Sequence, residues 1–208
     1  TGQYYKTNET GLMPRIVQGL YTERVVFKKK MIKAQQELQK IDPLDKQAVY
    51  NLERNLNRYQ NEQMSIKILL NSLYGAMGSQ YFRFFDQRIA ESITITGQLT
   101  IKWAEKKINT VLNRYLETGE TDYVIAMDTD SLYVNMNGLV EKFKPKDPIA
   151  FLDGVCKELE KEMTSSYAEL YEYLGGRTNR MEMDREAIAD RAIWTAKKRY
   201  ILNVHNNE

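Results

Sequence analysis

Two long helix-forming stretches, separated by a proline, constrain the fold of this chain more than any other feature. Residues 12–40 predict one helix, whose first turn suits Pro14 and whose end is rich in good helix formers. Pro43 cannot continue a helix interior, so we expect Asp42 to cap a second helix that begins at Pro43 and runs to about Leu73. Each helix would be roughly 45 Å long at 1.5 Å per residue. Two such helices joined by a short break predict an antiparallel hairpin.

The rest of the chain mixes helical and β-like patterns. Gly75 and Gly78 are expected to end the second helix, and residues 80–85 form an aromatic, strand-like run. Further helices are predicted over 88–116 and 148–174, and β-like runs over 123–127, 132–136, 180–184, 192–196 and 200–204. The chain is therefore predicted to be an α+β protein: a long antiparallel helical hairpin over residues 1–80, followed over residues 81–208 by a small antiparallel β-sheet packed by helices.

Composition excludes several classes of protein. The chain is 42% hydrophobic and 28% charged, as in soluble globular proteins, and no apolar run is long enough to cross a bilayer. The single cysteine, Cys156, cannot form an internal disulfide and is expected to fill core space. The single histidine, His205, has no Cys or His partner for a zinc site. Residues 1–80 carry twelve Lys and Arg against seven Asp and Glu, whereas residues 81–208 carry 18 against 21.

Two aspartates one residue apart, Asp128 and Asp130, lie between two β-like runs. At the turn of a hairpin, both carboxylates can be displayed together. Hard oxygen ligands of this kind bind Mg²⁺, which keeps room for water and substrate phosphates. The alternative is that both are ordinary turn residues, because aspartate tolerates turns well.

A second group of candidate residues lies on the second predicted helix. Lys67, Asn71 and Tyr74 are at positions i, i+4 and i+7 and therefore share one face. A cation, an amide and an aromatic ring in line can hold a phosphate and offer a flat surface to a base. Gly75, which follows, allows close approach of the backbone to that base.

The first predicted helix adds Arg24 and Lys28, also four residues apart. If the hairpin brings these faces together, Arg24, Lys28 and Lys67 form a cationic pocket suited to a triphosphate. The alternative is that these are solubilising charges and that Tyr74 belongs to the core. Near the end of the chain, the run Lys197-Lys198-Arg199-Tyr200 can neutralise nucleic-acid phosphates without reading sequence.

Three motifs in this order resemble those of family B DNA polymerases. Residues 67–75 match their Lys-x-x-x-Asn-Ser-x-Tyr-Gly motif, residues 128–131 their Asp-Thr-Asp-Ser motif, and residues 197–200 their Lys-Lys-Arg-Tyr motif. Within the family, the surrounding sequence is most similar to the replicative enzymes of T-even-type bacteriophages. The resemblance covers the whole chain, as part of the fingers over residues 1–80 and most of the later palm over residues 81–208.

The resemblance implies a role for each motif residue in template-directed nucleotidyl transfer by a two-metal mechanism. Asp130, with Asp128 beside it, would bind one of two Mg²⁺ ions, and Thr129 would lie near the primer end. The incoming dNTP would be bound by Arg24, Lys28, Lys67 and Asn71 at its triphosphate, with Tyr74 and Gly75 under the nascent base pair. The primer strand would be held by Lys197, Lys198, Arg199 and Tyr200. Glu186, in the run Met183-Asp184-Arg185-Glu186, resembles a further palm residue.

The resemblance also implies partners and a cellular setting. The expected partners are primer–template DNA, dNTPs, the exonuclease, first palm and thumb segments of the polymerase, and a sliding clamp. The setting is viral DNA replication in the cytoplasm of an infected bacterium. No stretch matches the family's Asp-x-x-Ser-Leu-Tyr-Pro-Ser motif, so we expect a partial chain that is inactive alone. The alternative function is a non-catalytic nucleic-acid-binding or assembly protein.

Overall fold

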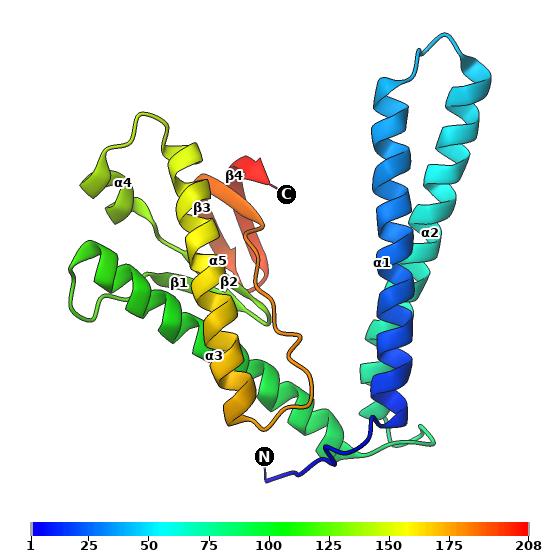
Figure 1. Cartoon of the computed structure of the whole chain (residues 1–208), viewed down its shortest axis with the longest axis horizontal. Coiled ribbons are helices and arrows are strands. Elements are labelled where there is room, and N and C mark those ends of the chain that lie inside the picture. Colours follow the sequence, from blue (N-terminus) through cyan, green and yellow to red (C-terminus); the bar gives the residue numbers. More distant parts are fainter. Residues whose placement is uncertain (1, 208) are drawn as a thin grey trace. The chain divides into compact units, whose positions relative to one another are not determined.

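The computed structural model describes residues 2–207 and confirms the α+β class (Figure 1). The elements, in chain order, are α1 (Leu12–Lys40), α2 (Lys46–Met77), α3 (Gln87–Leu116), β1 (Val124–Asp128), β2 (Ser131–Val134), α4 (Asn137–Phe143), α5 (Pro148–Tyr173), β3 (Ala187–Ala196) and β4 (Arg199–Asn207). The chain divides into two compact units between Ser92 and Ile93, and each unit is described by itself. None of the helices described over residues 2–207 is long and apolar enough to span a membrane.

Helices α1 and α2 form the predicted hairpin and pack along a seam with a heptad-like repeat. Less exposed side chains recur every three or four residues on both helices, which is the spacing of a coiled-coil interface. Phe27 of α1 contacts Tyr59 of α2, with ring centroids 6.4 Å apart. On α1 the seam positions are Leu20, Arg24, Phe27, Met31, Ala34 and Leu38, and on α2 they are Leu52, Leu56, Tyr59, Gln63, Ile66 and Leu70.

The start of the second helix differs from the prediction. The Asp42 carboxylate accepts a hydrogen bond from the Leu44 backbone N–H (2.9 Å), so it closes a local turn instead of capping a helix. Asp45 is the cap, because its carboxylate accepts from the Ala48 N–H at 3.1 Å. The helix therefore begins at Lys46, after Pro43. It continues through Gly75 and ends at Met77, with Gly78 as its C-cap.

Residues 80–85, predicted to be strand-like, form successive turns. The Phe82 N–H donates to the Ser79 carbonyl oxygen (3.0 Å) and the Phe85 N–H to that of Phe82 (2.9 Å). These local bonds satisfy backbone groups that a strand would have had to pair with a neighbour. The aromatic pattern alone could not show whether a partner strand would lie beside this segment, and no strand described within residues 2–207 pairs with it.

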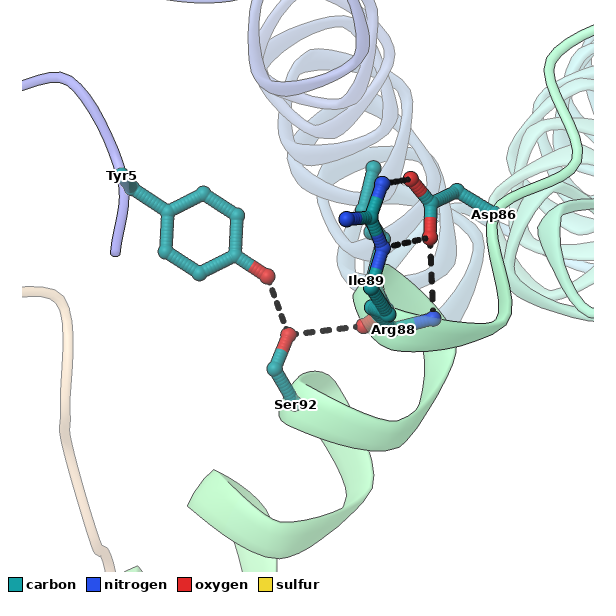
Figure 2. Close-up of polar contacts among 5 residues, drawn as sticks. All are labelled: Tyr5, Asp86, Arg88, Ile89 and Ser92. Carbon is teal, nitrogen blue, oxygen red and sulfur yellow. Dashed lines mark hydrogen bonds and ion pairs between the residues drawn. The ribbon is translucent and has the colours of Figure 1, made fainter. Parts of the chain in front are cut away.

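Polar contacts join the segment before α1 to the start of α3 (Figure 2). The Tyr5 hydroxyl contacts the buried Ser92 hydroxyl, which also donates to the Ile89 carbonyl oxygen at 2.9 Å. Asp86 accepts from Arg88 Nη2 (2.7 Å) and Nε (3.0 Å), and this hydrogen bonding lowers the pKa of the Asp86 carboxyl. The two ends of the hairpin are therefore held together within the first unit.

The second unit has one core, formed chiefly by α3, α5 and the residues around β1. Its buried residues are Ala104, Ile108, Leu112, Tyr123, Val124, Leu139, Met163, Tyr167 and Leu170. The Trp103 indole donates to the Ser166 hydroxyl (2.8 Å) and links α3 to α5. Cys156 is half-buried in α5, where burial raises the pKa of its thiol.

The β-structure of this unit is two ribbons, whereas the sequence predicted one sheet. Strands β1 and β2 pair with each other, as do β3 and β4, and all pairs are antiparallel. The predicted strand over residues 180–184 is absent. Met181 and Met183 pack against the core instead, and the Arg185 N–H donates to the Glu160 carboxylate of α5 (3.0 Å). The segment is thus held by core packing and by a side chain of α5 at its end.

Candidate functional site

Two asparagines of α3 fix the start of the aspartate-bearing hairpin. Asn109 accepts a hydrogen bond from the Tyr123 N–H (2.8 Å) and donates to the Asp122 carboxylate (2.8 Å). One turn later, Asn113 accepts from the Thr121 N–H (3.0 Å). Tyr123 is also buried in the core. The hydrogen bonds and this burial therefore fix the position of the start of strand β1 relative to α3.

The two aspartates lie at a tight turn, as predicted. Asp128 and Ser131 are register partners, so Thr129 and Asp130 form a two-residue loop between β1 and β2. The Asp130 N–H donates to the Asp128 carbonyl oxygen (2.7 Å), and the Thr129 hydroxyl donates to the Asp128 carboxylate (3.0 Å). Asp128 is half-buried and Asp130 is exposed.

The donor set at this turn has the chemistry of a partial magnesium site. Mg²⁺ is commonly bound by one or two carboxylates, with water and substrate phosphates as its other ligands. Asp128 and Asp130 can supply such carboxylates. Within the part of the chain that the structure describes, no group of three or more His, Cys, Asp or Glu residues is placed to hold a metal ion.

The basic run also lies at a two-residue turn. Ala196 and Arg199 are register partners, so Lys197 and Lys198 form the loop that joins β3 to β4. All four residues from Lys197 to Tyr200 are exposed. The turn therefore presents a concentration of positive charge to solvent, as backbone contacts to nucleic acid require.

An aromatic cluster links the ribbon that carries the aspartate turn to the ribbon that carries the basic turn. The Tyr133 ring of β2 packs edge-on against Trp194 of β3, with centroids 5.2 Å apart, and against Tyr200 of β4 at 5.3 Å. Burial, together with the hydrogen bond and charge of Tyr200, raises the pKa of Tyr133 to about 12. We call Tyr133, Trp194 and Tyr200 the aromatic cluster. Sequence reasoning missed Tyr133 and Trp194, whose sole signal was their occurrence in β-like runs close to each motif.

The hairpin of the first unit carries the other predicted residues. Because α1 and α2 are antiparallel, the Phe27–Tyr59 contact shows which residues are level. Lys67 follows Tyr59 by eight residues on α2, so it faces residue 19, which precedes Phe27 by eight residues on α1. Arg24 lies five residues along α1 from residue 19. At 1.5 Å per residue, Arg24 is therefore displaced from Lys67 by roughly 7.5 Å along the helix axis, and Lys28 is displaced by roughly 6 Å more. Long basic side chains can converge over such distances.

These residues also lie on one flank of the seam. At about 100° per residue, Arg24, at the edge of the seam, and Lys28, beside it, lie on the same side as Lys67, Asn71 and Tyr74. The other flank is marked by Lys30, whose amino group lies 5.5 Å from the centroid of the Phe27 ring and 5.9 Å from that of Tyr59. Helical geometry thus aligns five of the predicted residues in a row, which we call the arm row.

The environments of the arm-row residues differ. Arg24 is a half-buried seam residue whose Nε is buried without a hydrogen-bond partner among the described residues. Lys28, Lys67 and Asn71 are exposed. Tyr74 is 46% exposed, so the alternative that placed it in the core is wrong. A Cβ on Gly75, next to the row, would meet nothing within 4 Å.

The arm row lies in the first unit and both turns in the second. Glu186 is exposed and directly precedes β3. The structure therefore brings the predicted residues together as two groups: the arm row on the helical hairpin, and the aspartate and basic turns joined by the aromatic cluster.

Comparisons with known proteins agree with the motifs. A family model described as DNA polymerase family B matches residues 2–208. The chain is 42% identical over 161 residues to the DNA-directed DNA polymerase of Enterobacteria phage T4, which is 70% of this chain and 18% of that protein. It is 38% identical to the DNA-directed DNA polymerase of Escherichia phage RB69 over the same shares. It is 26% identical to the DNA polymerase alpha catalytic subunit of Dictyostelium discoideum over 92% of this chain and 10% of that protein.

Proposed function

Because this chain belongs to DNA polymerase family B, we propose that it takes part in template-directed DNA synthesis, the transfer of a nucleotide from a dNTP to the 3′ hydroxyl of a primer. The observation that carries the proposal is the ring contact of Tyr133, in the ribbon of the aspartate turn, with Trp194 and Tyr200, in the ribbon of the basic turn. A carboxylate pair beside a cationic turn is what a site needs if it is to hold both a metal ion and the DNA backbone. Residues 1–80 are proposed as part of the fingers and residues 81–208 as part of the palm.

Each turn has its own task in this proposal. Lys197, Lys198, Arg199 and Tyr200 hold the primer backbone by charge and hydrogen bonding, and Thr129 lies near the primer end. Asp130, with Asp128 beside it, holds Mg²⁺. When two ions are bound, they lower the pKa of the primer hydroxyl and stabilise the leaving pyrophosphate.

The arm row would bind the incoming nucleotide. Arg24, Lys28 and Lys67 neutralise the triphosphate, and Asn71 fixes its position. Tyr74 offers a ring to the nascent base pair, which the backbone at Gly75 can approach without a side chain in the way. Closure of this arm over a correct pair would be a selection step.

Substitution of Asp130 tests the site. In primer extension by a polymerase assembled from this chain and the family's remaining segments, we expect Asp130→Asn to reduce the rate on the order of a thousandfold, since several kcal/mol of charge stabilisation are lost. The affinity for primer–template measured without Mg²⁺ should be retained. Glu120→Gln, in the exposed loop before β1, is the control and should leave the rate unchanged. Full activity in Asp130→Asn would show that the aspartates are ordinary turn residues.

Nucleotide binding by the arm row can be measured on the purified chain. Lys67→Ala removes a charge-assisted contact worth about 1.5–3 kcal/mol, so the Kd for a dNTP should rise by about 10- to 100-fold. Lys29→Ala is the matched control, because Lys29 is exposed and lies on the side of α1 turned away from the seam. Equal effects of the two substitutions on calorimetrically measured binding would argue against the pocket.

The proposal includes partners and a setting. A third metal-binding carboxylate would come from a polypeptide with the Asp-x-x-Ser-Leu-Tyr-Pro-Ser motif, and the exonuclease, the thumb and a sliding clamp would be further partners in an infected bacterial cytoplasm. The purified chain should therefore not extend a primer unless that polypeptide is added. Robust extension by the chain alone would contradict this. DNA binding that never leads to extension in any mixture would favour a non-catalytic nucleic-acid-binding role.

A further inference from the structure

The two β-ribbons of the second unit share no backbone pairing, although their turns carry complementary chemistry. Strands β1 and β2 form one ladder and β3 and β4 another. Between them, the ring contacts are those of Tyr133 with Trp194 and Tyr200, at 5.2 and 5.3 Å. Side-chain packing, and not a continuous sheet, thus relates the aspartate turn to the basic turn.

The aromatic cluster lies close to both turns along the chain. Tyr133 is three residues from Asp130, Trp194 is three residues from Lys197, and Tyr200 is two residues from Lys198. At about 3.3 Å per residue in a strand, each ring lies within roughly 10 Å of its turn along the backbone. Trp194 and Tyr200 are direct register partners, so Tyr133 contacts both strands of the basic ribbon at one level.

Both turns are conformationally restricted. Thr129 and Lys198 each adopt a left-handed backbone, with φ of 56° and 63°. Such conformations are narrow for residues other than glycine. Each turn therefore has little conformational freedom of its own.

The cluster lies outside the main core of the unit. None of its three residues is among the buried core residues or the partly buried side chains packed on them, and Trp194 is 36% exposed. Residues 189–201 of the basic ribbon are all exposed. Substitutions in the cluster should therefore change how the ribbons are related more than whether the unit folds.

We propose that Tyr133 and Trp194 are positioning residues that couple the basic turn to the aspartate turn, so that DNA at the first and Mg²⁺ at the second strengthen each other's binding. This inference rests on the proposed function. Coupling of this kind is reciprocal, because each ligand favours the same arrangement of the two ribbons.

The test measures binding of a fluorescein-labelled primer–template to the purified 208-residue chain by anisotropy, with and without Mg²⁺ at matched ionic strength. We define the coupling as the factor by which Mg²⁺ tightens DNA binding in the unsubstituted chain, divided by the same factor in Asp130→Asn. In the unsubstituted chain we expect Mg²⁺ to tighten DNA binding by about 5- to 10-fold through this coupling. Tyr133→Ala should reduce the factor to below about twofold while leaving Mg²⁺-free DNA affinity within about twofold.

Two variants separate positioning from structural damage. Tyr133→Phe keeps the ring and should preserve the coupling, and Trp194→Ala, on the other side of the contact, should abolish it as Tyr133→Ala does. Phe143→Ala is the matched control and should leave the coupling intact. It disrupts a different aromatic pair of the same unit, Phe143 and Phe151, whose ring centroids are 5.8 Å apart.

The possible outcomes are distinct. Coupling that persists in both Tyr133→Ala and Trp194→Ala would overturn the inference and leave the proposed function standing. DNA binding that Mg²⁺ does not strengthen in the unsubstituted chain would also overturn it. A chain that binds neither DNA nor Mg²⁺ would overturn the inference and the proposed function together.

Discussion

At the scale of single residues, Thr129 has the most unusual backbone of the candidate site. It is β-branched, yet its φ is 56°, a region that such residues rarely enter. Its hydroxyl bonds the Asp128 carboxylate (3.0 Å), which helps to hold the turn. Strain beside two candidate metal ligands is typical of functional sites, where the surroundings maintain a geometry that the residue alone would avoid.

Replacing Thr129 with glycine should relieve this strain. The unfolding free energy of the second unit, measured by urea denaturation, should rise by about 1 kcal/mol. Thr195→Gly is the control, since Thr195 lies in strand β3 and glycine there should lower stability. An unchanged or reduced stability in Thr129→Gly would indicate that the turn is not strained.

At the scale of elements, the hairpin of α1 and α2 depends on its seam. Ile66 is 6% exposed and packs at the seam, whereas Ile68, two residues away on the same helix, is 58% exposed. Ile66→Ala should destabilise the hairpin by about 2–4 kcal/mol, because it leaves a cavity among packed side chains. Ile68→Ala should cost less than about 0.5 kcal/mol. Hydrogen exchange of the α1 and α2 amides can measure both, and similar losses would contradict the assigned seam.

Contacts between α3 and α5 should make the second unit sensitive to pH. The Arg114 guanidinium (2.9 Å), aided by Lys107 (3.5 Å), holds the pKa of Glu162 below its usual value of 4.5. A lowered pKa in the folded state contributes stability above pH 4.5, and this is lost as the pH falls through the lowered value.

Glu162→Gln should therefore lower the Tm near neutral pH, and the difference from the unsubstituted chain should shrink as the pH falls below 4.5. Thermal unfolding followed by circular dichroism across this range measures the difference. Glu169→Gln, at an exposed position of α5, should have little effect at any pH. A constant Tm difference for Glu162→Gln would show that the ion pair is not responsible.

At the scale of the whole molecule, the division at Ser92 and Ile93 predicts two unfolding transitions. Units with separate cores can unfold separately. Leu112 is fully buried in the core of the second unit, so Leu112→Ala should lower the midpoint of one calorimetric transition. Ile66→Ala should lower the midpoint of the other. A single transition shifted by both substitutions would show that the units unfold together.

Much of the local structure could be predicted because its causes are local. The bounds predicted for α1 are those observed, and α3 and α5 differ by a residue at one end. The aspartate turn was predicted for the same reason, since it depends on a few adjacent residues, whereas residues 197–200 were predicted only as a basic run. The errors came where local alternatives compete: Asp42 makes a turn so that Asp45 is the cap, and residues 80–85 bond within themselves.

The sequence by itself therefore determined the bounds of α1, α3 and α5 to within a residue, the aspartate turn and the family to which the chain belongs. The tertiary structure decided which strands pair, so that two ribbons form instead of one sheet, and it alone placed Tyr133 against Trp194 and Tyr200. The physical reason is range. Helix caps, turns and the pairing of strands within each ribbon join residues that are near in sequence. The ring packing that relates the two ribbons joins partners some 60 residues apart, which an alternating pattern cannot identify.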